Sequence, residues 1–251
     1  MNITFKDRTV VVTGGTQGIG ASIVEEFRLA EANLIITGAE SEEVIEKLNI
    51  EARAKGFNNL KYIRADFTDK DSFSSFFKTL DLIPHIDVFV NNAGTNRNNL
   101  IENIVAEDFE LLLNLNLKAP FEITKYLTKR LKAQNYGRIV NIASVWSVVT
   151  RERRAAYTIT KSGLVGLTKT SSVELAPYNV LVNAVSPGFT MTELTMATVP
   201  EEEIKLFSET VPAKRFAQPV EIARIVLFLS SDMNTYITGQ NIIIDGGFSN
   251  V

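Results

Sequence analysis

The chain has 251 residues, of which 45% are hydrophobic, and its 26 Lys and Arg residues against 29 Asp and Glu residues form no basic block that would bind nucleic acid. Because it contains no cysteine and one histidine, it excludes disulfides, a thiolate nucleophile and an ordinary zinc site, and we expect no metal. The charged residues Lys6, Asp7 and Arg8, and the lack of an apolar run approaching ~20 residues, predict a cytoplasmic protein without a secretory or membrane segment.

Short apolar runs rich in β-branched residues alternate along the chain with longer segments of helical spacing. The predicted strands cover residues 9–13, 33–37, 60–65, 86–90, 138–142, 180–185 and 241–244. Helices are predicted over residues 21–30, 42–55, 108–134, 155–176 and 220–229. This alternation predicts a doubly wound α/β fold of about seven parallel strands with helices on both faces, in a single domain over residues 1–251.

The longest stretch without a predicted strand or helix covers residues 186–219 and contains Pro187, Pro200, Pro212 and Pro219. A long insertion near the carboxyl edge of a parallel sheet is usually functional and often covers the bound ligand. We therefore expect a substrate loop in this segment.

A glycine-rich turn, Thr-Gly-Gly-Thr-Gln-Gly-Ile-Gly from Thr13 to Gly20, separates the first predicted strand from the first predicted helix. Glycines let the backbone approach a pyrophosphate closely, and the helix N-terminus offers unpaired N–H groups and a favourable dipole. The spacing Gly14-x-x-x-Gly18-x-Gly20 departs from the generic dinucleotide fingerprint, whose third glycine would fall at Ile23. The turn predicts a dinucleotide cradle, and a turn needed only for packing is the alternative.

Several motifs in order give the chain its resemblance to the short-chain dehydrogenases/reductases, whose cofactor loop has the form T-G-x-x-x-G-x-G. Ser144 stands thirteen residues before Tyr157, the usual family interval, and the match extends from about Lys6 to about Gly247. The landmarks that follow the glycine-rich turn are Asn91-Asn92-Ala93-Gly94, Asn116, Ser144, Tyr157-x-x-x-Lys161 and Pro187-Gly188. The chain is most similar to the 3-oxoacyl-carrier-protein reductases of this family. The resemblance implies a Rossmann-type fold and an NAD(P)(H)-dependent oxidoreductase that reduces a ketone to a secondary alcohol.

The expected catalytic residues are Asn116, Ser144, Tyr157 and Lys161. Tyr157 and Lys161 stand at positions i and i+4 of one predicted helix, so they share a face, and the ammonium would lower the phenol's pKa from ~10. Ser144 ends the fifth predicted strand, where its hydroxyl can bond the substrate oxygen. The resemblance implies that Asn116 positions a water beside the lysine. Taken alone, Tyr-x-x-x-Lys would more often be an exposed pair, but the surrounding motifs favour the catalytic interpretation.

The resemblance also implies that every motif contributes to binding a nicotinamide dinucleotide. Within the family, Asp66 is placed at the adenine and Thr192 beside the nicotinamide. The expected cofactor-binding residues are Gly14, Thr16, Gln17, Gly18, Ile19, Gly20, Asp66, Phe67, Asn92, Ala93, Gly94, Tyr157, Lys161, Pro187, Gly188 and Thr192.

The end of the second predicted strand bears on the choice between NADP(H) and NAD(H). No aspartate ends this strand, and Thr37 and Ser41 could hydrogen-bond a 2′-phosphate, so NADP(H) is slightly favoured over NAD(H). Glu40 opposes this choice because its charge would repel the phosphate. Ala39 and Gln17 stand where many relatives carry a basic residue.

The segment of residues 145–154 follows Ser144 and, by resemblance, lines the substrate pocket with Trp146 near the reacting carbon. Its charged end, Arg151 to Arg154, could meet an acidic substrate or be a solvated loop or a subunit contact. We expect a 3-oxoacyl thioester or a similar β-keto compound as substrate. A sugar, polyol or other small secondary alcohol is the alternative. A cofactor-binding regulator or a purely structural protein is disfavoured because the catalytic residues are intact.

The resemblance further implies a homotetramer built through the predicted helices 108–134 and 155–176 and the strand 241–244. The substrate could be bound to an acidic carrier protein, which would need a basic surface. The residues that could form this surface are Lys125, Lys129, Arg130 and Lys132 on the first of these helices, with Arg151, Arg153 and Arg154 nearby.

Overall fold

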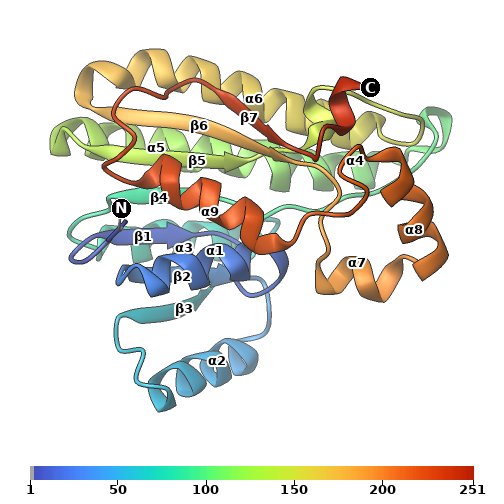
Figure 1. Cartoon of the computed structure of the whole chain (residues 1–251). Coiled ribbons are helices and arrows are strands. Elements are labelled where there is room, and N and C mark those ends of the chain that lie inside the picture. Colours follow the sequence, from blue (N-terminus) through green and yellow to red (C-terminus); the bar gives the residue numbers. More distant parts are fainter. Residues whose placement is uncertain (1–2) are drawn as a thin grey trace.

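The computed structural model describes residues 3–251, except for the side chains of residues 194 and 198, and its centre is a parallel sheet (Figure 1). The strand order is β3-β2-β1-β4-β5-β6-β7, and every pairing is parallel. The predicted Rossmann-type fold is thus confirmed, and each predicted strand overlaps an observed one. The strands are β1 (Thr9–Val12), β2 (Asn33–Gly38), β3 (Leu60–Arg64), β4 (Val88–Asn91), β5 (Gly137–Ile142), β6 (Val180–Pro187) and β7 (Asn241–Ile244).

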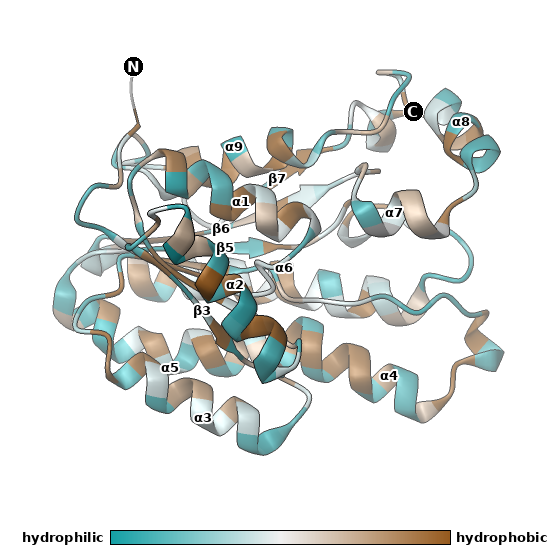
Figure 2. Cartoon of the chain, turned by 90° about the horizontal axis from the view of Figure 1, so that it is seen from below, coloured by the Kyte–Doolittle hydropathy of each residue, from teal (hydrophilic) through white to brown (hydrophobic). Residues whose placement is uncertain are grey.

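Helices cover both faces of the sheet, as Figures 1 and 2 show. One face carries α1 (Gly18–Leu29), α2 (Glu42–Ala54) and α9 (Pro219–Ser230). The other carries α3 (Lys70–Asp81), α4 (Ala106–Leu113), α5 (Ala119–Gln134) and α6 (Ala155–Leu175). Within residues 3–251, no helix has both the length and the apolar character that crossing a membrane requires.

The core consists of two apolar layers, one on each side of the sheet. Because successive side chains of a strand point to opposite faces, Val10 and Val12 join the layer that holds Phe27 of α1, whereas Val11 joins the layer that holds Leu127 of α5. All of these side chains are buried. A strand covered on both faces must be apolar at every position, which explains the continuous Val-Val-Val sequence of β1.

Three helical features differ from the sequence prediction. The predicted helix 108–134 is interrupted by a π-helical turn, Asn114–Lys118, which separates α4 from α5. Helix α3 was not predicted, although Phe73, Phe76, Phe77 and Leu80 stand at helical spacing and pack into the core layer of α5. The segment 186–219 contains two short helices, α7 (Glu193–Thr198) and α8 (Glu201–Thr210).

The strand order determines where a ligand can bind. The chain turns back at β1, so β2 and β3 lie on one side of it and β4 to β7 on the other. Connections that leave neighbouring strands toward opposite sides leave a crevice at the carboxyl edge of the sheet. The glycine-rich turn after β1 and the Asn92-Ala93-Gly94 segment after β4 therefore meet at this crevice.

Candidate active site

A cavity of about 920 Å³ opens at the carboxyl edge of the sheet, where the β1 and β4 loops meet. Of the four predicted catalytic residues, Ser144, Tyr157 and Lys161 line the cavity. Asn116 is buried and lies outside the lining. The predicted cofactor-binding residues all line it, and they are Gly14, Thr16, Gln17, Gly18, Ile19, Gly20, Asp66, Phe67, Asn92, Ala93, Gly94, Tyr157, Lys161, Pro187, Gly188 and Thr192.

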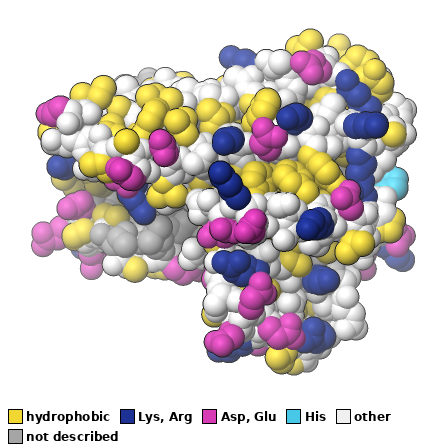
Figure 3. Space-filling model, turned by 180° about the vertical axis from the view of Figure 1, so that it is seen from behind, with side chains coloured by type: hydrophobic (Ala, Val, Ile, Leu, Met, Phe, Trp, Pro, Cys, Tyr) yellow, Lys and Arg dark blue, Asp and Glu magenta, His cyan; other side chains and the backbone are white. Residues whose placement is uncertain are grey.

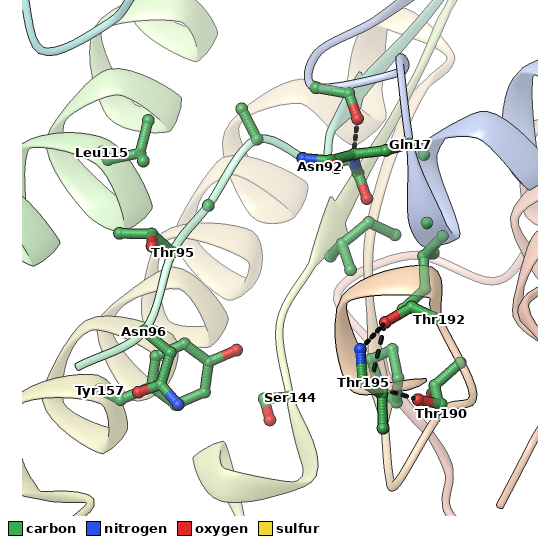
Figure 4. A pocket seen from close by; sticks show the side chains of 18 of the residues that line it. Gln17, Asn92, Thr95, Asn96, Leu115, Ser144, Tyr157, Thr190, Thr192 and Thr195 are labelled. Atoms are coloured by element: carbon green, nitrogen blue, oxygen red, sulfur yellow. Dashed lines mark hydrogen bonds between the residues drawn. The ribbon is translucent and has the colours of Figure 1, made fainter. Parts of the chain in front are cut away.

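The glycine-rich turn has no room for side chains at the positions that form the cradle. Gly14 and Gly18 have positive φ angles of 61° and 57°, which other residues rarely adopt. A Cβ atom on Gly20 would stand 2.1 Å from the carbonyl oxygen of Gly14. The Asn92 side chain holds the turn by donating hydrogen bonds to the carbonyl oxygens of Thr13 and Gly14, at 2.9 and 2.7 Å (Figure 4). The turn, the cavity and the N-terminus of α1 fit a dinucleotide.

Glu193, the first residue of α7, reaches the N-terminus of α1. Its carboxylate accepts a hydrogen bond from the backbone N–H of Gly18 at 3.2 Å. The first N–H groups of a helix are the usual binding site for a pyrophosphate. The Glu193 carboxylate therefore occupies a donor that a bound dinucleotide would use. The sequence analysis missed this residue, since its only signal was its place in the predicted substrate loop.

Three of the predicted catalytic side chains come from the end of β5 and from α6. Ser144 follows β5, and its hydroxyl accepts a hydrogen bond from the backbone N–H of Trp146 at 3.3 Å. Tyr157 and Lys161 share one face of α6, as predicted, and the lysine Nζ lies 5.7 Å from the centre of the phenol ring. Figure 4 shows Ser144 and Tyr157 at the same cavity. The Lys161 ammonium also donates to the carbonyl oxygen of Ile142 at 2.7 Å.

Burial changes the protonation of both groups on α6. It lowers the pKa of Lys161, which is 4% exposed, to about 8. Burial raises the pKa of the Tyr157 phenol, whereas the Ser144 hydroxyl and the Arg154 guanidinium lower it. Because the pKa of Lys161 lies near neutrality, this lysine can give a proton to Tyr157 and take one up again at physiological pH.

Asn116 lies in the π-helical turn beneath the cavity floor. Its Oδ1 accepts from the N–H of Thr95, and its Nδ2 donates to the Thr95 carbonyl and the Thr160 hydroxyl, at 2.9, 2.9 and 3.2 Å. A Cβ atom on Gly94 would lie 3.0 Å from Asn116 Oδ1 and 3.5 Å from Lys161 Nζ, so both groups lie beside this glycine. The side chain is therefore bound to protein groups, and a water-positioning role stays a prediction.

The end of β2 brings acidic side chains to the adenosine side of the cavity. Glu40 accepts a hydrogen bond from the Thr16 hydroxyl at 2.6 Å, and its second carboxylate oxygen is buried without a protein partner. The hydroxyl oxygens of Thr37 and Ser41 accept backbone N–H groups of Gly14 and Val44, at 3.3 and 3.4 Å. The carboxylate of Glu40 is thus the group at this end of the cavity that would meet a 2′-phosphate.

An aromatic wall encloses the substrate side of the cavity. Trp146, predicted near the reacting carbon, packs edge-on against Phe189, whose ring stacks between those of Phe207 and Phe216. These phenylalanines come from the predicted substrate loop, 186–219, and line the cavity with Trp146. The sequence analysis did not identify them, because phenylalanines spread over a long segment show no periodicity.

Comparisons with known proteins agree with this geometry. The family model described as Enoyl-(Acyl carrier protein) reductase matches residues 14–249. The 3-oxoacyl-[acyl-carrier-protein] reductase FabG of Aquifex aeolicus is 38% identical, over 98% of this chain and 99% of its own length. The same reductase of Staphylococcus aureus is 35% identical, over 96% of this chain and 97% of its own length.

Solved structures show the same fold. A putative gluconate dehydrogenase from Agrobacterium tumefaciens has a TM-score of 0.92 at 30% identity, with 100% of this chain and 99% of that one covered. A gluconate 5-dehydrogenase from Burkholderia cenocepacia, in complex with NADP and tartrate, has a TM-score of 0.91 at 26% identity, with 100% and 98% covered. The chain belongs to the short-chain dehydrogenase/reductase family. It is an NAD(P)-dependent oxidoreductase that acts on CH–OH groups.

Substitution of Tyr157 by phenylalanine removes the phenol hydroxyl and leaves the ring. We expect Tyr157→Phe to fold normally and to lose at least about 100-fold in kcat, which is the contribution of a positioned general acid. Tyr178→Phe, on the surface beyond α6, is the matched control and should keep full activity. Steady-state kinetics with circular dichroism would test this, and undiminished turnover in Tyr157→Phe would exclude the mechanism.

Substitution of Glu193 by glutamine should strengthen dinucleotide binding. It removes a negative charge that competes for the N-terminus of α1, where one charge contributes about 0.3–1 kcal/mol, so we expect a decrease in Kd of roughly twofold to fivefold. Titration of the nicotinamide fluorescence measures the Kd. Glu202→Gln removes an exposed charge from the neighbouring helix α8 as the control. A Kd for Glu193→Gln that equals that of the wild type, or exceeds it, would contradict the competition.

Proposed function

We propose that the chain reduces the ketone of a 3-oxoacyl thioester, or of a similar β-keto compound, to the secondary alcohol. The observation that carries this proposal is identity over nearly the whole chain to 3-oxoacyl-[acyl-carrier-protein] reductases, at 35–38%. The cavity supports it, because Ser144, Tyr157 and Lys161 converge there beside a cradle that fits a dinucleotide.

The side chains have distinct roles in this reaction. A bound nicotinamide would supply the hydride to the carbonyl carbon. The Ser144 hydroxyl donates a hydrogen bond to the carbonyl oxygen and holds it toward Tyr157. The Tyr157 phenol gives its proton to that oxygen as negative charge develops on it, and Lys161 returns a proton to the phenolate. The aromatic wall of the 186–219 segment, which we assign as the substrate loop of this single domain, excludes water from the reacting atoms.

Oxidation or reduction of a sugar, a polyol or another small secondary alcohol is the second candidate. It is favoured by the two gluconate dehydrogenases, which have TM-scores of 0.92 and 0.91 with this chain. The same catalytic residues serve either direction, since the phenolate of Tyr157 accepts the alcohol proton in the oxidation.

A homotetramer is the assembly that we propose for this chain. Apolar side chains are exposed on the helices expected to form it, with Phe121 of α5 46%, Ile159 of α6 51% and Val173 of α6 76% accessible. Figure 3 shows apolar side chains spread over the face of the molecule behind the sheet. Helix pairing that covers such side chains removes apolar area from water.

Of the surface predicted to receive a carrier protein, Arg151 and Arg154 line the cavity, whereas the part on α5 does not adjoin it. Helix α5 runs back toward the amino edge of the sheet, where the side chain of Gln134 bonds the backbone of Ile86, just ahead of β4. Arg130 is already engaged with the carbonyl oxygens of Leu80 and Ile83. A carrier-bound substrate would therefore need another landing surface than Lys125, Lys129, Arg130 and Lys132.

A panel of substrates tests the function. The wild-type protein is mixed with NADPH or NADH and a β-ketoester, a β-keto thioester, a ketogluconate or a ketose, and the nicotinamide absorbance is followed. We expect the β-keto compounds to have the highest kcat/KM. No reduction of any β-keto compound beside rapid oxidation of a sugar or polyol would establish the second candidate. Cofactor binding without turnover would instead indicate a regulator.

The cofactor we propose is NADP(H), by a small margin over NAD(H). It is supported by ElxO, solved with NADP bound, which has a TM-score of 0.90 at 29% identity and covers 97% of this chain and 99% of its own. Glu40 keeps the preference for NADP(H) over NAD(H) small, because a carboxylate at the adenosine end repels a 2′-phosphate.

Removal of the Glu40 charge should increase the preference for NADPH over NADH. Glu40→Gln keeps an acceptor for the Thr16 hydroxyl, so we expect the ratio of kcat/KM for NADPH to that for NADH to rise about tenfold, which corresponds to about 1.4 kcal/mol. The matched control is Glu42→Gln, which removes an exposed charge from the first turn of α2. An unchanged ratio in Glu40→Gln would show that Glu40 does not discriminate between the cofactors, and a clear advantage of NADH in the wild type would overturn the choice of NADP(H).

A further inference from the structure

Two arginines enter the cavity beside the catalytic residues. Arg151 and Arg154 both line the cavity that holds Ser144 and Tyr157, whereas Arg153, between them in the chain, does not. Arg154 is the N-cap residue of α6, one helical turn before the catalytic tyrosine. The mechanism assigns no role to either guanidinium.

Aromatic rings hold both guanidinium groups. The Arg151 guanidinium carbon lies 5.4 Å from the centre of the Trp146 ring system and 5.0 Å from that of Phe207, and the Arg154 guanidinium lies 5.3 Å from Trp146. A guanidinium that contacts a ring through its face keeps the N–H groups of its edge for a planar oxyanion. The aromatic wall thus positions two forks of hydrogen-bond donors at the substrate side of the cavity.

Neither arginine has an acidic partner among the residues that the structure describes. None of the ion pairs among the described residues contains Arg151 or Arg154. Glu193 and Glu203 also line the cavity, but neither is paired with these arginines. Burial lowers the pKa of Arg154, and the neighbouring charge of Arg151 lowers it further. Arg154 is thus a half-buried cation without a counterion beside the exposed Arg151, which is destabilising, and an anion bound to Arg154 would relieve that cost.

We propose that Arg154, together with Arg151, binds a carboxylate of the substrate, so that the ketone reduced here is a keto acid. This inference rests on the proposed function and narrows it, because among β-keto compounds it selects those with a free carboxylate. Arginine is the side chain best suited to the two oxygens of a carboxylate, which it binds through two parallel hydrogen bonds.

The position of Arg154 favours a carboxylate over the phosphate of a carrier or coenzyme arm. The Arg154 charge lies close enough to Tyr157 to lower the pKa of the phenol that protonates the carbonyl oxygen. An anion on Arg154 must therefore be a few bonds from the reacting carbonyl. The phosphates of a thioester's arm are separated from the carbonyl by a long flexible chain and would lie outside the cavity.

Matched pairs of keto acids and neutral ketones test the proposal. The pairs are acetoacetate and levulinate, each with its ethyl ester, and 5-ketogluconate with sorbose, so that the carboxylate stands at different distances from the ketone. We expect the wild type to prefer the acid in at least one pair. In Arg154→Gln the ratio of kcat/KM for that acid to its neutral partner should fall about 10- to 100-fold, the contribution of hydrogen bonds to a charged group.

Further variants separate recognition from a structural role. Arg153→Gln removes the same charge from the same loop outside the cavity and should keep the wild-type ratio. Arg151→Gln should lower the ratio independently of Arg154. Arg154→Lys keeps the charge but loses the planar guanidinium, so its ratio of kcat/KM for the acid to its neutral partner should lie between those of Arg154→Gln and the wild type.

Inhibition by a small carboxylate gives a second measurement. Butanoate should inhibit reduction of the ethyl ester competitively in the wild type, whereas the neutral butanamide should not. Arg154→Gln should lose the inhibition by butanoate.

The failures of the two proposals can be told apart. No reduction of any ketone by the wild type, with either cofactor, contradicts the proposed function itself. Reduction of acids and neutral partners with equal kcat/KM, without inhibition by butanoate, overturns the carboxylate site and leaves the function in place. A loss in Arg154→Gln that is confined to acetoacetyl-coenzyme A, and absent with the free acids, would show that the arginines bind the phosphate of the thioester arm instead.

Discussion

The hydrogen bonds between Thr13 and the segment after β4 join the two loops on which the whole site depends. The Thr13 hydroxyl oxygen accepts the backbone N–H groups of both Asn92 and Ala93 at 3.0 Å, and the Asn92 amide returns two bonds to the glycine-rich turn. Parallel pairing of β1 with β4 brings these segments to one edge, but it does not fix the loops beyond the last paired residues. The contacts of Thr13 and Asn92 fix these two loops relative to each other, and so they shape the cradle at the carboxyl edge of the sheet.

The charges of the cavity are separated along its length. Glu40 and Asp66 lie among the residues that follow β2 and β3, whereas Arg151 and Arg154 lie at the other end beside the aromatic wall. Lys161 is buried between them and keeps a pKa of about 8. A dinucleotide and a keto acid are both anionic, so this distribution directs the carboxylate to the arginines, while Glu40 and Glu193 lie where they would affect the cofactor.

Much of the fold could be predicted from the sequence, because buried parallel strands require apolar runs and turns require glycine. Helix α3 could also have been predicted, from the helical spacing of Phe73, Phe76, Phe77 and Leu80. The π-helical turn at Asn116 could not, because it depends on tertiary contacts with Thr95 and Thr160. The motif residues were predicted because each is required close to the ligand. Glu193 and the phenylalanines of the aromatic wall could not be, since only folding of the 186–219 segment brings them to the cavity.

The arginines also bear on the direction of the reaction. Burial raises the pKa of Tyr157, while Arg154 opposes that effect as long as its charge has no counterion. A carboxylate bound to Arg154 would offset this positive charge and would let the pKa of the phenol rise. Ketone reduction requires the protonated phenol, whereas alcohol oxidation requires the phenolate. An acidic substrate would therefore make the phenolate that oxidation needs harder to form, so a carboxylate on Arg154 favours reduction over oxidation.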